Sequence, residues 1–166
     1  MAVFPIRTWG DLVLTSVAEP VDTIDESLDR LIEDMLDTMY DAPGVGLAAP
    51  QIGVPRRVFV FDVGEGPNAV INPELLETSG EWEFDEGCLS VPGRYWPIVR
   101  PNYAKVRGLD ADGNEVVHEG DELLGRVLQH ETDHLDGMLL LKRLNRSVRK
   151  EALRALREEA MGLPSE

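Results

Sequence analysis

The feature that most constrains the fold is the run His130-Glu131-Thr132-Asp133-His134. Residues four apart in a helix lie on one face, so two imidazoles with this spacing can bind a single metal ion. Glu131 then lies beside the metal, where a carboxylate can take a proton from bound water. The flanking residues make this helix mostly apolar: Leu123, Leu124, Val127, Leu128 and Leu135. The sequence therefore predicts a buried helix that carries a metal site, rather than a solvated helix with two unrelated histidines.

The composition indicates one folded domain without a membrane partner. At 166 residues and 43% hydrophobic content, we expect one domain over residues 1–166, with a C-terminal helix and tail from about residue 145. No apolar run approaches the length of a membrane span, and the N-terminus lacks the apolar core of a signal peptide. Cys88 is the only cysteine, which fits a reducing compartment. We expect a cytoplasmic protein and, by default, a monomer.

Charge is distributed unevenly along the chain. The net charge of -15 disfavours DNA as a partner. From Lys142 to Glu166 there are seven basic and four acidic residues, a net of +3, which leaves -18 for the preceding 141 residues. Two interpretations stay open for this basic segment. It can dock on RNA or an acidic partner, or it can be a solvated helix with ion pairs such as Arg154 with Glu158.

Hydrophobic periodicity predicts a helix near each end of the chain. Leucines and methionines recur at helical spacing after a capping-box pattern of Thr23 and Glu26, and Pro43-Gly44 ends this helix. The last helix is expected over about 147–161. For the metal-motif helix, Asp121 is the candidate cap, and Gly137 stands where a left-handed residue ends many helices.

Short β-prone segments lie between these helices. Strands are expected at 58–61 and 69–73, and a hairpin is expected from 104–109 and 115–118 around the turn 110–114. The strands do not alternate regularly with helices. This order predicts an α+β domain, with small antiparallel sheets packed around the central metal-motif helix and with N-terminal and C-terminal helices.

A catalytic site of this type needs a third protein ligand and one open position. One peptidase class has a third histidine where this chain has Leu140, and another uses a downstream glutamate. Here the downstream glutamates lie in the basic terminal segment, which has the character of a surface helix: Glu151, Glu158 and Glu159. Cys88 is preferred, because a thiolate and two imidazoles suit a tetrahedral divalent metal. His118 is the competing candidate.

Residues 44–53 form a glycine-rich stretch with the sequence GVGLAAPQIG. Its small residues indicate a backbone that a ligand approaches closely. It lacks the Lys followed by Ser or Thr of a phosphate-binding loop. Gln51 within it is a candidate amide donor to an anionic centre.

Together, GVGLAAPQIG, EGCLS and QHETDHLDG resemble the three signature motifs of the peptide deformylases, in the family's order and approximate spacing. Gly10-Asp11, Leu14, Ala18 and Pro20-Val21 also look like the family's N-terminal segment, so the resemblance covers nearly the whole chain. It implies removal of the formyl group from the N-terminal formyl-methionine of nascent bacterial polypeptides, with release of formate.

By position, the resemblance assigns Cys88, His130 and His134 as ligands of one divalent metal ion and Glu131 as the general base. The Leu89 backbone N–H and the Gln51 amide would stabilise the developing oxyanion. The resemblance also implies ferrous iron in the cell, whereas purified protein can carry zinc, nickel or cobalt.

The resemblance further assigns residues around the substrate. Val45, Gly46 and Gly87 would pair with the peptide backbone, and Val127 would form a wall of the methionine pocket. Glu86 would pair with Arg100 behind the metal, although a surface salt bridge is the simpler alternative. The family's long C-terminal helix is implicated in ribosome contact, which favours docking for the basic segment of this chain.

This chain departs from the family in one segment. The family commonly has an arginine near the peptide-binding surface after the ligand cysteine, where this chain reads Pro92-Gly93-Arg94-Tyr95-Trp96-Pro97. Contacts beyond the methionine are therefore not carried over.

Two other functions remain open. The first is a small HExxH endopeptidase that uses a terminal-helix glutamate as its third ligand. The second is a metal-stabilised binding module in which His118 completes a closed site.

Overall fold

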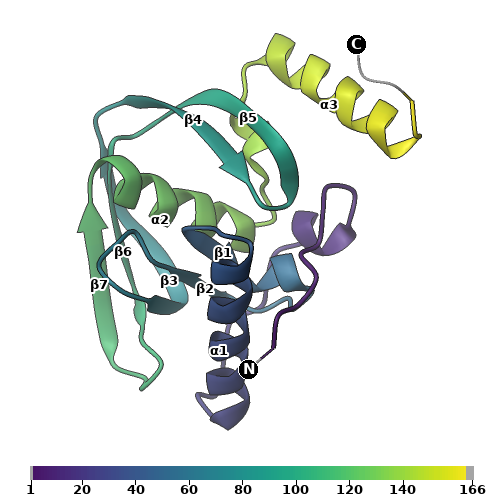
Figure 1. Ribbon diagram of the computed structural model, residues 1–166. Helices are drawn as coiled ribbons and strands as arrows, with labels where there is room; N and C mark the ends of the chain where they lie inside the picture. The colour runs from purple at the N-terminus through teal and green to yellow at the C-terminus, as the bar shows by residue number, and fades with distance from the viewer. Residues whose placement is uncertain (1, 164–166) are drawn as a thin grey trace.

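The computed structural model describes residues 2–163 and has an α+β architecture, as predicted (Figure 1). One antiparallel sheet has the strand order β1-β2-β3-β6-β7, and a separate antiparallel hairpin consists of β4 and β5. The strands are β1 (Gly46–Ala48), β2 (Val58–Phe61), β3 (Asn68–Ser79), β4 (Trp82–Cys88), β5 (Val91–Arg100), β6 (Tyr103–Leu109) and β7 (Glu115–Gly120). The helices are α1 (Glu26–Asp41), α2 (Glu122–Leu135) and α3 (Arg146–Ala160), with short 3-10 turns η1 (Leu12–Thr15), η2 (Ala49–Ile52) and η3 (Leu140–Arg143).

The first helix packs one apolar stripe against the sheet. Leu28, Ile32, Met35 and Met39 follow helical spacing and are buried against β1, β2 and η2. The predicted cap was wrong. Asp25 is the N-cap and accepts a hydrogen bond from the backbone N–H of Leu28 at 3.1 Å, so α1 begins at Glu26 rather than near residue 23.

The five-stranded sheet contains each strand predicted for it. All four residues of β2 are buried, as expected from its unbroken apolar run. β3 continues well beyond the predicted 69–73, because it pairs with β6 from Ile71 to Ser79, with register shifts after Ile71 and after Leu75. The turn at 110–114 joins β6 to β7, as predicted.

Helix α2 lies at the centre, between the sheet and the β4–β5 hairpin (Figure 1). Its apolar residues Val127, Leu128 and Leu135 pack against Phe59 and Val106 of the sheet. Asp121 takes the N-cap position, but its side chain makes no capping hydrogen bond, and the Asn102 Oδ1 accepts from the Glu122 N–H instead, at 3.1 Å.

Gly137 confirms the expected end of this helix. Its φ of 74° lies in the left-handed region, and a Cβ there would meet the Thr15 backbone at 2.9 Å.

The β4–β5 hairpin was not predicted. It packs through Val91 and Ile98 against η3 and against Ala152 and Leu156 of α3. The α3 helix agrees closely with the predicted 147–161 and starts from an Asn145 cap. Within residues 2–163, none of the helices has both the length and the apolarity needed to cross a bilayer.

Candidate active site

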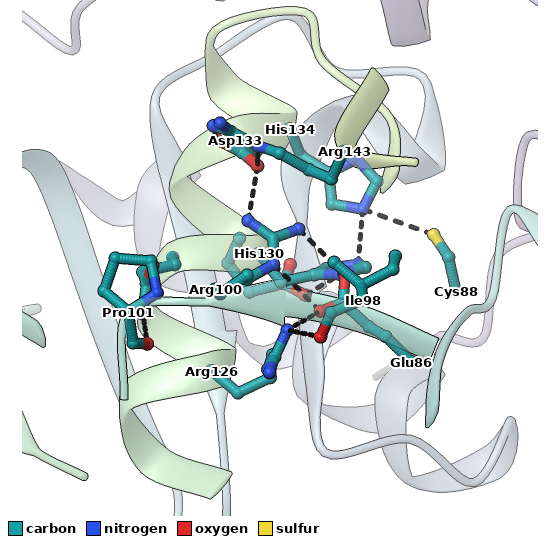
Figure 2. A network of polar contacts seen from close by, with 12 residues as sticks. Glu86, Cys88, Ile98, Arg100, Pro101, Arg126, His130, Asp133, His134 and Arg143 are labelled. Atoms are coloured by element: carbon teal, nitrogen blue, oxygen red, sulfur yellow. Dashed lines mark hydrogen bonds and ion pairs between the residues drawn. The ribbon is translucent and has the colours of Figure 1, made fainter. Parts of the chain in front are cut away.

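The two histidines of α2 and the cysteine at the end of β4 meet at one point (Figure 2). The Nε2 atoms of His130 and His134 are 3.1 Å apart, and the Cys88 Sγ lies 3.4 Å from the His134 Nε2. Around a tetrahedral ion with ordinary bond lengths, two nitrogens lie about 3.3 Å apart and a sulfur and a nitrogen about 3.6 Å apart. These two separations therefore match a tetrahedral divalent metal site, and all three ligand atoms lie within 4.8 Å of one another.

The competing ligands lie elsewhere. The His118 ring packs edge-on against Phe61 at 5.1 Å, and partial burial lowers its pKa. Glu158 and Glu159 pair with Arg154 and Arg94 instead. Within residues 2–163, Cys88, His130 and His134 are the one group of His, Cys, Asp or Glu side chains with atoms close enough to share an ion. This grouping favours Cys88 as the third ligand.

Behind His130, Glu86 is the centre of a buried ionic network (Figure 2). Its carboxylate accepts two hydrogen bonds from Arg100, at 2.9 and 2.8 Å, and one from Arg126 at 3.1 Å. The Glu86 Oε2 also lies 2.8 Å from the His130 Nδ1. Burial alone would raise the pKa of Glu86, but the hydrogen bonds from His130 and Arg100 outweigh it and hold that pKa well below its usual value. Glu86 is therefore a permanent anion that turns the His130 Nε2 toward the metal position.

The Glu86–Arg100 pair is buried rather than on the surface. Their side chains are 4% and 3% exposed, so removing either partner would take one counter-charge away from a charge that stays buried.

In front of the histidines, Glu131 has few polar contacts. Its side chain is 5% exposed, and its Oε2 has no hydrogen-bond partner among residues 2–163. Its Oε1 lies 3.9 Å from the His130 Nε2. Burial raises the pKa of Glu131 to about 7, although the charge of His130 opposes this shift. A carboxyl with a near-neutral pKa beside a metal position is suited to carry a proton.

Gly46 makes room for that carboxylate. A Cβ at Gly46 would lie 2.9 Å from the Glu131 Oε1 and 3.1 Å from its Cγ. The close approach found at this stretch is therefore an approach to Glu131, and the approach of a ligand stays a prediction.

Gln51 is held from both ends of its amide. The Oε1 accepts from the Ala48 N–H at 2.9 Å, which directs the Nε2 toward the Ser90 Oγ at 3.0 Å and the Cys88 Sγ at 3.7 Å. The amide donor is thus fixed beside the candidate thiolate ligand.

A cleft of about 730 Å³ opens in front of these groups. Most of the residues singled out in the sequence line it: Val45, Gly46, Gln51, Glu86, Gly87, Cys88, Leu89, Val127, His130 and Glu131. His134 and Arg100 do not line it but are buried. Phe84, Leu123 and Tyr95 also line the cleft. They were missed because the β4–β5 hairpin was missed and because Leu123 has the appearance of an ordinary core residue.

Comparison with known proteins identifies the family. The family model described as Polypeptide deformylase matches residues 3–150. The chain is 52% identical over 143 residues to a peptide deformylase of Clostridium botulinum, covering 86% of this chain and 97% of the relative. It is 52% identical over 158 residues to a peptide deformylase of Acidothermus cellulolyticus, covering 95% of this chain and 88% of the relative. The fold is similar to a crystal structure of a peptide deformylase from Legionella pneumophila, with a TM-score of 0.90, 45% identity and 96% of each chain covered. The chain belongs to the polypeptide deformylase family.

Deformylases remove N-terminal formyl groups from nascent peptides, so this chain is a hydrolase with that activity. The family is metal-dependent, and the cysteine and two histidines of this deformylase fit a divalent ion by their distances.

Sequence reasoning missed two charged residues of this deformylase site. Arg126 and Asp133 lie four residues before and three residues after His130, on the same face of α2. Asp133 accepts hydrogen bonds from Arg100 and Arg143, and Arg126 donates to Glu86. The signal was available, since two charges on the histidine face of a buried helix require partners.

Proposed function

We propose that this deformylase hydrolyses the formyl amide of formyl-methionyl nascent peptides, with Cys88, His130 and His134 as metal ligands and Glu131 as the general base. The observation that carries the proposal is the meeting of a thiol, two imidazoles and a buried carboxyl beside one cleft, with the Oε2 of that carboxyl lacking a hydrogen-bond partner among residues 2–163. Family membership supplies the reaction, and the site geometry supports these roles.

A divalent ion in this ligand set supplies Lewis acidity and makes water acidic enough to act as a nucleophile near neutral pH. We propose ferrous iron in the cell, and zinc, nickel or cobalt in protein purified in air, because thiolate and imidazole ligands accept all four. Metal analysis of protein purified without oxygen tests this choice.

Glu131 moves the proton. As water attacks the formyl carbon, the Glu131 carboxylate takes the proton from that water and then delivers it to the departing nitrogen. The products are formate and a free methionine N-terminus. Among the described residues the Glu131 Oε2 has no hydrogen-bond donor, which supports this role. A carboxylate paired with arginines would have a low pKa and would not take up a proton readily.

The oxygen of the formyl group gains negative charge in the transition state. We propose that the Gln51 Nε2 and the Leu89 backbone N–H donate to it. The hydrogen bond that the Gln51 side chain accepts from Ala48 supports this role, because it fixes which end of the amide faces the thiol.

The peptide lies along the cleft. We propose that the backbones of Val45, Gly46 and Gly87 pair with the substrate backbone in the manner of an added strand. Val127 forms a wall for the methionine side chain, and Phe84 and Leu123 line the same cleft.

The decisive experiment measures formate release from a formyl-Met-Ala-Ser peptide by the parent and by Glu131→Gln. The parent should release formate rapidly, and the variant should release almost none while it retains its metal. No release by a fully metallated parent would refute the assigned site.

We also propose that the basic α3 docks on the ribosome, so that the enzyme meets nascent chains in the cytoplasm as a monomer. Its support is a row of exposed cations at one-turn spacing on α3, preceded by the exposed Lys142 of η3: Arg146, Lys150, Arg154 and Arg157. The double variant Lys150→Glu/Arg154→Glu should lose a salt-sensitive association with ribosomes in a sedimentation assay. Unchanged binding would contradict docking. Size-exclusion chromatography tests the monomer.

A further inference from the structure

The ionic network behind the metal ligands extends to the surface through Arg143. This residue ends η3, and its side chain is 41% exposed. Its guanidinium holds the Asp133 carboxylate in a two-point contact, with the Nε 3.0 Å from the Oδ2 and the Nη2 2.7 Å from the Oδ1. Asp133 lies next to His134 on the buried face of α2.

From Asp133 the contacts continue inward without a gap (Figure 2). The Asp133 Oδ2 accepts from the Arg100 Nη1 at 2.7 Å, and Arg100 grips both oxygens of Glu86. Glu86 then meets the His130 Nδ1 at 2.8 Å. Four charge-assisted contacts thus connect an exposed arginine to a candidate metal ligand.

Arg143 is the outermost residue of this series of contacts and fixes the Asp133 carboxylate. Asp133 accepts three hydrogen bonds in all, and Arg143 donates two of them. Without Arg143, the Asp133 Oδ1 loses the one donor it has in these three bonds, so the carboxylate can rotate or bind water. Arg100 would then lose the fixed acceptor on its Nη1. Guanidinium and carboxylate groups are planar, so a two-point contact sets orientation as well as distance.

We propose that Arg143 is a positioning residue for the metal centre, which sets the orientation of His130 through Asp133, Arg100 and Glu86. The inference rests on the proposed ligand set. By this inference Arg143, the last residue of η3, affects the active site, although it contacts neither the cleft nor the three ligand side chains.

The test compares Zn²⁺ affinity, by chelator competition, among the parent, Arg143→Gln, Arg143→Lys and Arg57→Gln. Arg57→Gln is the matched control. Arg57 also binds the C-terminal end of α2, through the Leu135 carbonyl and Asp136, each at 2.8 Å, but makes no contact with Glu86. Groups that contact a ligand directly usually change metal affinity about 10- to 100-fold. Because Arg143 acts through three intermediate groups, Arg143→Gln should weaken Zn²⁺ binding roughly five- to tenfold. Arg143→Lys should recover only part of this loss, since an ammonium cannot make the two-point contact.

A second readout separates positioning from stability. Co²⁺-loaded Arg143→Gln should have shifted ligand-field absorption bands, whereas the bands of Arg57→Gln should match the parent. Urea unfolding of the metal-free proteins identifies any general loss of stability. Arg143→Gln with a Zn²⁺ affinity within twofold of Arg57→Gln, and with parental Co²⁺ bands, would overturn the inference. A parent that binds neither ion would instead refute the ligand set itself, and the two failures are therefore distinguishable.

Discussion

Two buried glutamates flank His130, and they have opposite properties. On the back of the ring, Glu86 has three cationic or imidazole partners, and its pKa is held below the usual range despite burial. On the front, the Glu131 Oε2 has no partner among residues 2–163, and burial raises its pKa to about 7. Burial is nearly equal, at 3% and 4% residue exposure. The number of partners, rather than depth, therefore separates the fixed charge from the proton carrier.

The largest effect should come from the front carboxylate. Glu131→Gln keeps the side-chain shape but removes the base, so kcat should fall by about 10²- to 10⁴-fold with metal content unchanged. Steady-state formate release and metal analysis of the same preparation check this. Retention of more than a tenth of parental kcat would show that another group carries the proton.

The two carboxylates should also affect the pH dependence of stability in opposite directions. In the metal-free protein the pKa of Glu131 is raised from 4.5 to about 7, so the folded state binds this proton more tightly and stability falls as pH rises from 4.5 to 7. The loss amounts to about 3 kcal/mol. The pKa of Glu86 is lowered, so its contribution to stability is present above pH 4.5 and is lost as pH falls below it.

Urea unfolding at pH 5 and pH 8, with a chelator present, measures this difference. Glu131→Gln should gain stability relative to the parent as pH rises, and the exposed Glu83→Gln on β4 is the control. A parent and a Glu131→Gln variant with parallel pH profiles would mean that Glu131 has partners in solution that keep its pKa low.

The back carboxylate should act mainly on the metal. Glu86→Gln leaves Arg126 without an anion, leaves Arg100 with Asp133 alone, and removes the anionic acceptor of His130, so Zn²⁺ affinity should fall about 10- to 100-fold. Chelator competition measures it, again beside Glu83→Gln. A Glu86→Gln protein with parental metal affinity and reduced kcat alone would reverse the roles assigned to the two sides.

The smallest effect should come from the glycine that faces Glu131. Gly46→Ala places a Cβ 2.9 Å from the Glu131 Oε1, so the carboxylate must shift by a few tenths of an ångström. We expect kcat to fall roughly tenfold, because small misplacements of a catalytic group cost about one to two orders of magnitude. Metal content should not change. Equal kcat in parent and variant would show that Glu131 tolerates displacement.

Local patterns in the sequence predicted a good part of the fold. The three helices, β2, the β6–β7 hairpin and the left-handed Gly137 all follow from spacing within about a dozen residues. The error at the start of α1 was also local. Thr23 and Asp25 are both good capping residues, and the Leu28 N–H donates to Asp25.

The β4–β5 hairpin shows where local reasoning fails. Three of the seven β4 residues are exposed and three are acidic, and its apolar alternation is short, because Glu86 stands where the pattern of Trp82 and Phe84 calls for a third apolar residue. It forms a strand because its partner β5 packs against η3 and α3, elements more than 40 residues further along the chain. Missing this hairpin also meant missing Phe84 and Tyr95 in the cleft wall.

The sequence by itself determined the two histidines one turn apart and the glutamate between them, because helical spacing is a property of a few neighbouring residues. Only the tertiary structure decided that the Cys88 Sγ reaches 3.4 Å from the His134 Nε2, and that Asp133 joins Arg143 to Arg100. Such contacts depend on how distant segments close on one another, and their strength depends on burial that exists only once the core has formed.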